Sequence, residues 1–341
     1  MTTNMKKITT LTVCVVLLSV VLICIRFLPE KKDKIMDDTQ SINIVNEQIN
    51  NVNSVNIINN YGEYSVIKNK ENKLEVSGLE KYPRDENNYD ELADKVSNLS
   101  ADKIVNSENS HLDIYGLDNP QAQINISYNN NLNFEILIGN QAPGEIGYYM
   151  IQKDKPQVYL ISSDSVSPFL KSKLDYISLS VTAPISSDET MKNLEYIELL
   201  GGNRPEKIKI VKEKSKDKFV YKITEPVNKE ISKEGTEIID SIENIFAQKI
   251  EMINVTQEDI NKYRFDNPFA TLKLKYKNKN MINIIISQIP DSEDFFVMRT
   301  DYNIIYRVAK YNLEWADISI EKLTGEQETE DVIEDVINED E

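Results

Sequence analysis

Apolar and polar residues alternate along two separate stretches of the chain. Residues 122–128 place Ala, Ile, Ile and Tyr at every second position, and residues 270–276 place Ala, Leu, Leu and Tyr in the same way. A second alternating run follows each stretch, at residues 134–138 and 282–286, after a short polar turn. A period of two is typical of a strand with one buried face, so each pair of runs predicts a β-hairpin.

The same six-residue motif precedes both predicted hairpins. Tyr-Gly-Leu-Asp-Asn-Pro ends at Pro120, and Tyr-Arg-Phe-Asp-Asn-Pro ends at Pro268. The positions that the two copies share are Tyr115, Asp118, Asn119 and Pro120, then Tyr263, Asp266, Asn267 and Pro268. Because the alternating strands follow each motif in the same register, we interpret the two regions as an internal repeat.

Upstream of each motif, the spacing of apolar residues changes to that of a helix. The apolar positions are Leu92, Val96 and Leu99 in the first copy and Ile238, Ile242 and Ile245 in the second. Each stripe predicts a helix that packs on one face of a sheet. Asn88 and Glu91 have the spacing of a capping box for the first helix.

Further short apolar runs flank each helix and hairpin. Three are predicted before each helix, at residues 55–58, 64–67 and 74–76, then at 196–200, 208–211 and 219–223. Two more follow each hairpin, at residues 147–150 and 158–161, then at 295–298 and 305–308. Together these elements predict an α+β fold: a tandem repeat of a mainly antiparallel sheet with a packed helix.

An uncharged run of eighteen residues, Ile8–Ile25, lies near the start of the chain. Its length approaches the roughly 20 residues that cross a bilayer, and no small-residue cleavage pattern follows it. We therefore predict a transmembrane signal anchor at residues 8–28, after a short N-terminal segment at residues 1–7. Basic residues lie on both sides of the run, so charge alone leaves its orientation open, with a small excess on the C-terminal side.

The remaining boundaries follow from composition and from the repeat. Residues 29–49 are polar without sustained periodicity and predict a linker, and residues 323–341 are rich in Glu and Asp and predict a disordered acidic tail. The first α+β repeat is assigned to residues 50–182 and the second to residues 190–322. At 341 residues, the chain is long enough for two domains that each bury a core.

Charge and residue usage exclude several classes of function. The formal net charge of −17 disfavours binding to nucleic acid, whose phosphates it would repel. Both cysteines, Cys14 and Cys24, lie inside the apolar run, and His111 is the one histidine, so Cys-based metal sites and His-pair zinc sites are excluded. We predict no catalytic residue, no metal site and no cofactor, and therefore no enzyme.

These motifs resemble those of a bacterial family of proteins, the domain of unknown function 4340. The matching elements are the motif at residues 115–120, an Ile-Gly turn at residues 138–139 and a Gly-Tyr-Tyr strand at residues 147–149. The second copy departs from the pattern at Arg264, at residues 287–288 and at residues 295–296. The resemblance implies a membrane-anchored protein outside the cytoplasm, often alongside an ABC-type export system similar to gliding-motility transporters, which places residues 1–7 in the cytoplasm.

Two readings of the motif residues lead to different roles. Asp118 and Asp266 are expected to cap a turn before an edge strand, which is a structural role, rather than to act as paired carboxylates. Gly147, Tyr148 and Tyr149 form a candidate binding surface, because exposed tyrosines stack on sugars or on protein partners. His111 is expected to be an exposed loop residue, and the lysines at residues 207–214 to lie on the solvent face of a strand.

Two functions remain open from the sequence. The first is a noncatalytic, extracytoplasmic accessory or interaction subunit of an ABC-type export complex, held in the cell membrane by one helix and bound to protein partners. The second is a module that binds a cell-envelope glycan or a small ligand.

Overall fold

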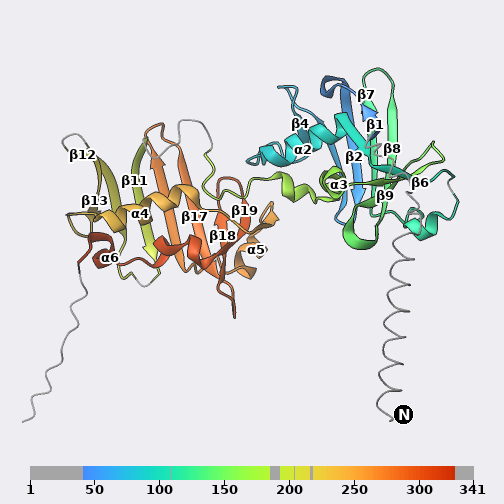
Figure 1. The fold of residues 1–341 in the computed structure, drawn as a ribbon. Coiled ribbons are helices and arrows are strands. Elements are labelled where there is room, and N and C mark those ends of the chain that lie inside the picture. The colour runs from blue at the N-terminus through green and yellow to red at the C-terminus, as the bar shows by residue number, and fades with distance from the viewer. Residues whose placement is uncertain (1–40, 109, 185–192, 203, 216–217, 327–341) are drawn as a thin grey trace, which may run out of the picture. The chain divides into compact units, whose positions relative to one another are not determined.

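The computed structural model describes residues 41–108, 110–184, 193–202, 204–215 and 218–326 (Figure 1). The predicted anchor at residues 8–28 lies outside the described residues, as does most of the predicted linker. None of the helices within the described residues has both the length and the apolarity to cross a membrane.

The first large sheet contains eight strands. In spatial order they are β4 (Leu74–Val76), β3 (Gly62–Lys68), β2 (Val52–Asn59), β7 (Ala122–Tyr128), β8 (Asn133–Gln141), β9 (Tyr148–Gln152), β10 (Val158–Ile161) and β6 (Lys103–Asn106). A separate pair is formed by β1 (Ile42–Asn46) and β5 (Asn98–Ala101). The fold thus begins earlier than predicted, since β1 lies in the stretch that was expected to be a linker.

The second large sheet contains nine strands. In spatial order they are β14 (Lys229–Glu230), β13 (Lys218–Glu225), β12 (Ile208–Ser215), β11 (Leu194–Gly201), β16 (Ala270–Tyr276), β17 (Met281–Gln288), β18 (Asp294–Arg299), β19 (Ile304–Ala309) and β15 (Lys249–Ile253). The strand pairings within the described residues of both sheets are antiparallel. The prediction of a mainly antiparallel α+β fold is confirmed.

The two sheets share the register of their central strands. Ala122 of β7 pairs with Ile138 of β8, and Ala270 of β16 pairs with Ile286 of β17. On the other side of the central strand, Ile57 pairs with Ile124 and Leu199 pairs with Leu272. The alternating residues on the inner face are buried in both sheets, as a period of two requires.

Each half contains the helix that the helical spacing predicts, but in the second half this helix ends at Ser241, before Ile242 and Ile245. The α-helices are α2 (Glu86–Ser97), α3 (Ser163–Leu170), α4 (Lys233–Ser241), α5 (Gln257–Lys262) and α6 (Ile320–Thr324). Helix α2 buries Leu92 and Val96 completely, and α4 buries Ile238 and Ile239. Leu99 lies beyond the end of α2, in β5, where it is also buried.

The N-cap of α2 differs from the prediction. Asp85, not Asn88, precedes the first helical residue, and its carboxylate accepts a hydrogen bond of 3.0 Å from the Asn88 N–H. Asn88 lies inside the first turn, and its side chain donates to the Asp175 carbonyl instead. The predicted capping box is therefore wrong by three positions, because Asp is as good an N-cap as Asn.

Short 3-10 helices complete the two halves of the fold. They are η1 (Ile49–Asn51), η2 (Leu112–Tyr115), η3 (Pro143–Glu145), η4 (Lys173–Tyr176), η5 (Ile242–Asn244), η6 (Lys310–Asn312) and η7 (Glu314–Asp317). We refer to residues 52–176 as the first half and residues 194–324 as the second half. The predicted acidic tail begins inside the fold, since Leu323 of α6 is fully buried, and residues 327–341 lie outside the described residues.

The buried Arg299 fastens a connecting segment to the second sheet. Its guanidinium donates to the carbonyl oxygens of Val181 and Ala183, and its other nitrogens bind Asp301 at 2.9 to 3.1 Å. Arg299 has no exposed surface, whereas the Asp301 side chain is one-fifth exposed. Val181, which the sequence assigned to the end of the first repeat, is thus bound to the second half.

Candidate functional site

The repeated motif forms the end of a helical turn in both halves. In the first half, η2 is followed by Gly116 at a φ of 67°, and the Leu117 N–H donates to the Leu112 carbonyl at 3.0 Å. In the second half, Arg264 has a φ of 60°, and the Phe265 N–H donates to the Ile260 carbonyl at 2.9 Å. A left-handed residue followed by this long-range hydrogen bond is a Schellman ending of a helix.

The hydrophobic residue after each ending packs beneath the motif's tyrosine. Leu117 and Phe265 are both buried, each in a small apolar cluster with residues of the neighbouring strands. The Tyr115 ring lies edge-on to Tyr149 with centroids 4.9 Å apart, and Tyr263 lies edge-on to Phe296 at 4.7 Å. The motif therefore joins a helical turn to the sheet by packing, which is a structural role.

The aspartates of the motif do not form the expected caps. Asp118 and Asp266 are exposed, and neither carboxylate accepts a hydrogen bond from the described residues. Asn119 and Asn267 are exposed as well. The prediction that these side chains close the turn is wrong, because backbone hydrogen bonds and the left-handed residue already close it.

The candidate surface at residues 147–149 is less exposed than expected. Gly147 is buried, and there is no room for a side chain, since a Cβ atom there would lie 2.2 Å from the Ile161 carbonyl oxygen. Tyr148 and Tyr149 are half-buried, and Tyr149 belongs to the cluster beneath the motif. The loop before them, residues 142–147, joins β8 to β9 as a hairpin loop.

The exposed position expected for His111 is confirmed, whereas the solvent face expected for the lysines of residues 207–214 is confirmed for Lys207 and Lys209 but not for Lys212, whose ammonium lies over the ring of the buried Tyr221. His111 is exposed, in the loop directly before η2. Lys207 pairs with Glu198 and Glu225, and Lys209 lies over the Tyr196 ring and near Glu225. These lysines are therefore engaged by side chains of their own sheet.

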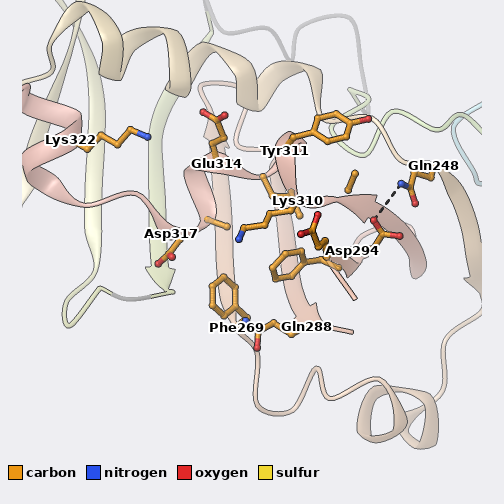
Figure 2. Close-up of a pocket in the computed structure, with 14 residues that line it drawn as sticks. Gln248, Phe269, Gln288, Asp294, Lys310, Tyr311, Glu314, Asp317 and Lys322 are labelled. Carbon is orange, nitrogen blue, oxygen red and sulfur yellow. Dashed lines mark hydrogen bonds between the residues drawn. The ribbon is translucent and has the colours of Figure 1, made fainter. Parts of the chain in front are cut away.

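A groove of about 800 Å³ lies in the second half, where the facing ends of β17 and β18 meet η6 and η7 (Figure 2). It combines segments from before β15, before β16 and from α6 with these strand ends. The residues that line it are Gln248, Phe269, Gln288, Glu293, Asp294, Phe295, Ala309, Lys310, Tyr311, Leu313, Glu314, Ala316, Asp317 and Lys322.

Aromatic rings form part of the groove wall. Tyr311 is 75% exposed, the largest value among the exposed hydrophobic residues of the described chain. Phe269 and Phe295 lie against each other with centroids 5.4 Å apart. Phe246 does not line the groove, but it is 53% exposed, and its carbonyl oxygen accepts a hydrogen bond from Asn312, the residue after Tyr311. Exposed aromatic rings at a concave surface are typical of a binding site.

Polar side chains of both charges share the same wall. Gln248 donates to the Asp294 carboxylate at 3.4 Å, and the Lys310 side chain extends across the groove in Figure 2. The lining holds four carboxylates, two ammonium groups and two amides. Among the described residues, no group of three or more His, Cys, Asp or Glu side chains is placed to hold a metal ion.

A buried arginine lies beside the groove. Arg204 donates to the carbonyl oxygens of Trp315 and Ile318, and with Asp317 it lines a smaller hollow of about 300 Å³. Burial lowers the pKa of the Arg204 guanidinium, and the charge of Asp317 acts in the opposite direction. Arg204 thereby holds η7 and the segment that follows it in place, which fixes one wall of the groove.

One residue of the groove, Phe295, occupies the position in the second half that is equivalent to Tyr148 of the predicted tyrosine surface. Tyr148 pairs with Gln141 at the start of β9, and Phe295 pairs with Gln288 at the start of β18. Phe295 is thus the counterpart of Tyr148, and it lines the groove. The sequence indicates this position, because Phe295 and Phe296 replace the pair Tyr148 and Tyr149 of the first half. No periodic pattern of residues indicates Tyr311.

One family model matches the chain, that of a domain of unknown function (DUF4340), at residues 75–268. The match covers more than half of the 341 residues and runs from β4 to the end of the second motif. No curated protein and no solved structure matches the chain.

Proposed function

We propose that this chain, which belongs to the DUF4340 family, a family of unknown function, is a noncatalytic, membrane-anchored binding subunit of an ABC-type export complex. The groove of the second half carries this proposal. It is concave, it lies within the range of about 300 to 1,000 Å³ that holds ligands, and it exposes an aromatic ring to which a ligand can bind.

The proposal treats the two halves as copies of one domain. The shared order of the central strands, their equal register and the two equivalent Schellman endings support this duplication. A duplicated domain lets one copy keep a structural role while the other acquires a binding surface. The groove in the second half and the buried Gly147 in the first half agree with that division.

The proposed location depends on the sequence. The uncharged run Ile8–Ile25 supports an anchor, and the family resemblance supports an extracytoplasmic position for both halves. Protease added to intact, wall-stripped cells is expected to digest residues 41–326. Complete protection of this region would reverse the orientation and remove the proposed site from the cell surface.

Affinity purification from solubilised membranes tests the proposed partners. The full-length chain is expected to recover the ATPase and the permease of an ABC-type system, identified by mass spectrometry. Tyr61→Ala is the control variant and is expected to recover the same partners. Tyr61 is 72% exposed, but it lies in a turn of the first half, away from the groove residues. Recovery of no transporter component with the wild-type chain would contradict the export assignment.

A further inference from the structure

We propose that the groove binds a neutral oligosaccharide chain, with Tyr311 as the ring on which one sugar stacks. This inference rests on the proposed binding function and names the class of ligand. Three properties of the groove support it: an exposed aromatic face, polar groups that both donate and accept, and an excess of negative charge.

The aromatic face matches the apolar side of a sugar ring. A pyranose ring carries its C–H groups on two faces and its hydroxyl groups around the edge, so it packs on a flat aromatic surface. Tyr311 offers such a surface because three quarters of it is exposed. Phe269 and Phe295 extend the apolar wall of the same groove. A tyrosine also loses little conformational freedom on binding, since it has only two side-chain torsions.

The polar groups match the hydroxyl groups at the edge of the ring. A hydroxyl donates one hydrogen bond and accepts others, so a sugar is best bound where donors and acceptors alternate. The amides of Gln248 and Gln288 supply both, the ammonium of Lys310 donates, and the Asp294 carboxylate accepts. A lipid chain would leave these groups unpaired, at a cost for each.

The charge of the groove argues against an anionic ligand. Four carboxylates face two ammonium groups along the lining, and the whole chain carries a formal charge of −17. A phosphate-bearing or uronic-acid polymer would be repelled on approach and again on contact. The open groove, rather than a closed cavity, suits a chain of linked sugars that passes through it.

The single tryptophan of the chain makes binding measurable. Trp315 is fully buried in η7, between Glu314 and Ala316, which both line the groove. The test titrates the purified full-length protein in detergent with cellotetraose, maltotetraose and an N-acetylglucosamine tetramer, following tryptophan fluorescence and calorimetry. At least one tetramer is expected to bind saturably, and polygalacturonate and an unrelated decapeptide are expected not to.

Variants tie the binding to the groove. Tyr311→Ala is expected to weaken binding by about tenfold, whereas Tyr311→Phe, which keeps the ring, and Tyr61→Ala, which lies elsewhere, retain it. Circular dichroism confirms that each variant folds. The proposal is overturned if no neutral tetramer binds, if only polygalacturonate or the peptide binds, or if Tyr311→Ala binds as well as the wild type.

The outcome separates this inference from the proposed function. If the chain recovers ABC components from membranes but binds no tetramer, the ligand class is wrong and the export assignment stands. If a tetramer binds in the groove but no transporter component is recovered, the ligand class stands and the export assignment falls.

Discussion

The two halves of the chain share the order of their central strands, but they differ in how one pair of neighbouring strands is hydrogen-bonded. In the first half, the pairing of β8 with β9 shifts between Ile138 and Gln141, so that Gly139 and Asn140 bulge from the ladder. In the second half, Ser287 and Gln288 continue the ladder and pair with Phe296 and Phe295. A bulge in the first half and a regular ladder in the second thus lie at equivalent points of the two sheets.

The difference lies beside the groove of the second half. The bulge brings Gly139 against the motif, where a Cβ atom would lie 2.2 Å from the Tyr115 carbonyl oxygen. In the second half the ladder reaches its end undisturbed, and Gln288 and Phe295 both line the groove. A bulge re-aims the residues that follow it, so its loss changes which side chains reach the surface.

The largest expected effect comes from the arginine that only the second half contains. Arg299 pairs with Ile284, and its counterpart in the first half, Gln152, pairs with Ile136. Arg299→Ala removes the partner of Asp301 and the hydrogen bonds to the carbonyl oxygens of Val181 and Ala183. We therefore expect the free energy of unfolding to fall by about 3–5 kcal/mol. Gln152→Ala, at the equivalent position, is expected to cost under about 1 kcal/mol.

Urea unfolding followed by Trp315 fluorescence measures the loss in the second half, and circular dichroism follows the whole chain. Equal losses from Arg299→Ala and Gln152→Ala would show that the clamp on Val181 and Ala183 contributes nothing to the difference between the halves.

Exchanging residues at the bulge position is expected to have the next largest effect. Gly139→Ser places a Cβ atom against the Tyr115 carbonyl, so the strand must shift, at a cost of about 1–3 kcal/mol. The reverse change, Ser287→Gly, costs only the added chain entropy of a glycine in a strand, about 0.5–1 kcal/mol. Thermal unfolding compares the two, and a Gly139→Ser variant as stable as the wild type would remove the bulge from the explanation.

A smaller effect, of opposite sign, is expected at the helix endings. Arg264 holds the left-handed conformation that Gly116 adopts in the first half. Arg264→Gly relieves that strain and is expected to stabilise the second half by about 1 kcal/mol. Gly116→Ala adds the same strain and brings a Cβ atom to 2.4 Å from the Asn140 side chain, so it is expected to destabilise by about 1–2 kcal/mol.

Trp315 fluorescence in urea detects the gain for Arg264→Gly, and circular dichroism detects the loss for Gly116→Ala. If both substitutions destabilise the chain, the two endings are not equivalent.

The smallest effect is expected at the repeated aspartates. Asp118→Ala and Asp266→Ala remove exposed side chains without hydrogen bonds to the described residues, so each is expected to change stability by less than about 0.5 kcal/mol. Paired melting curves of the two variants at equal protein concentration measure this. A loss above about 1 kcal/mol in either one would mean that the carboxylate caps its turn in solution.

The sequence predicted the strands well because each buries one face, and burial at every second residue leaves a direct pattern in the residue types. It predicted the motif but not its contacts: Leu117 and Phe265 pack the turn, while the conspicuous Asp118 and Asp266 point to solvent. The groove was missed because it combines ends of separate strands with 3-10 helices at residues 310–317, and such helices are too short to show a period.

Each of the two sheets ends, on one side, in a very short strand. Covalent linkage keeps each sheet at a high local concentration near the other, and free strand edges of the same kind readily join. One edge of the first sheet is β4, with three residues, and one edge of the second is β14, with two. Edges this short offer few unpaired backbone groups, so strand exchange and fibre growth from them are disfavoured.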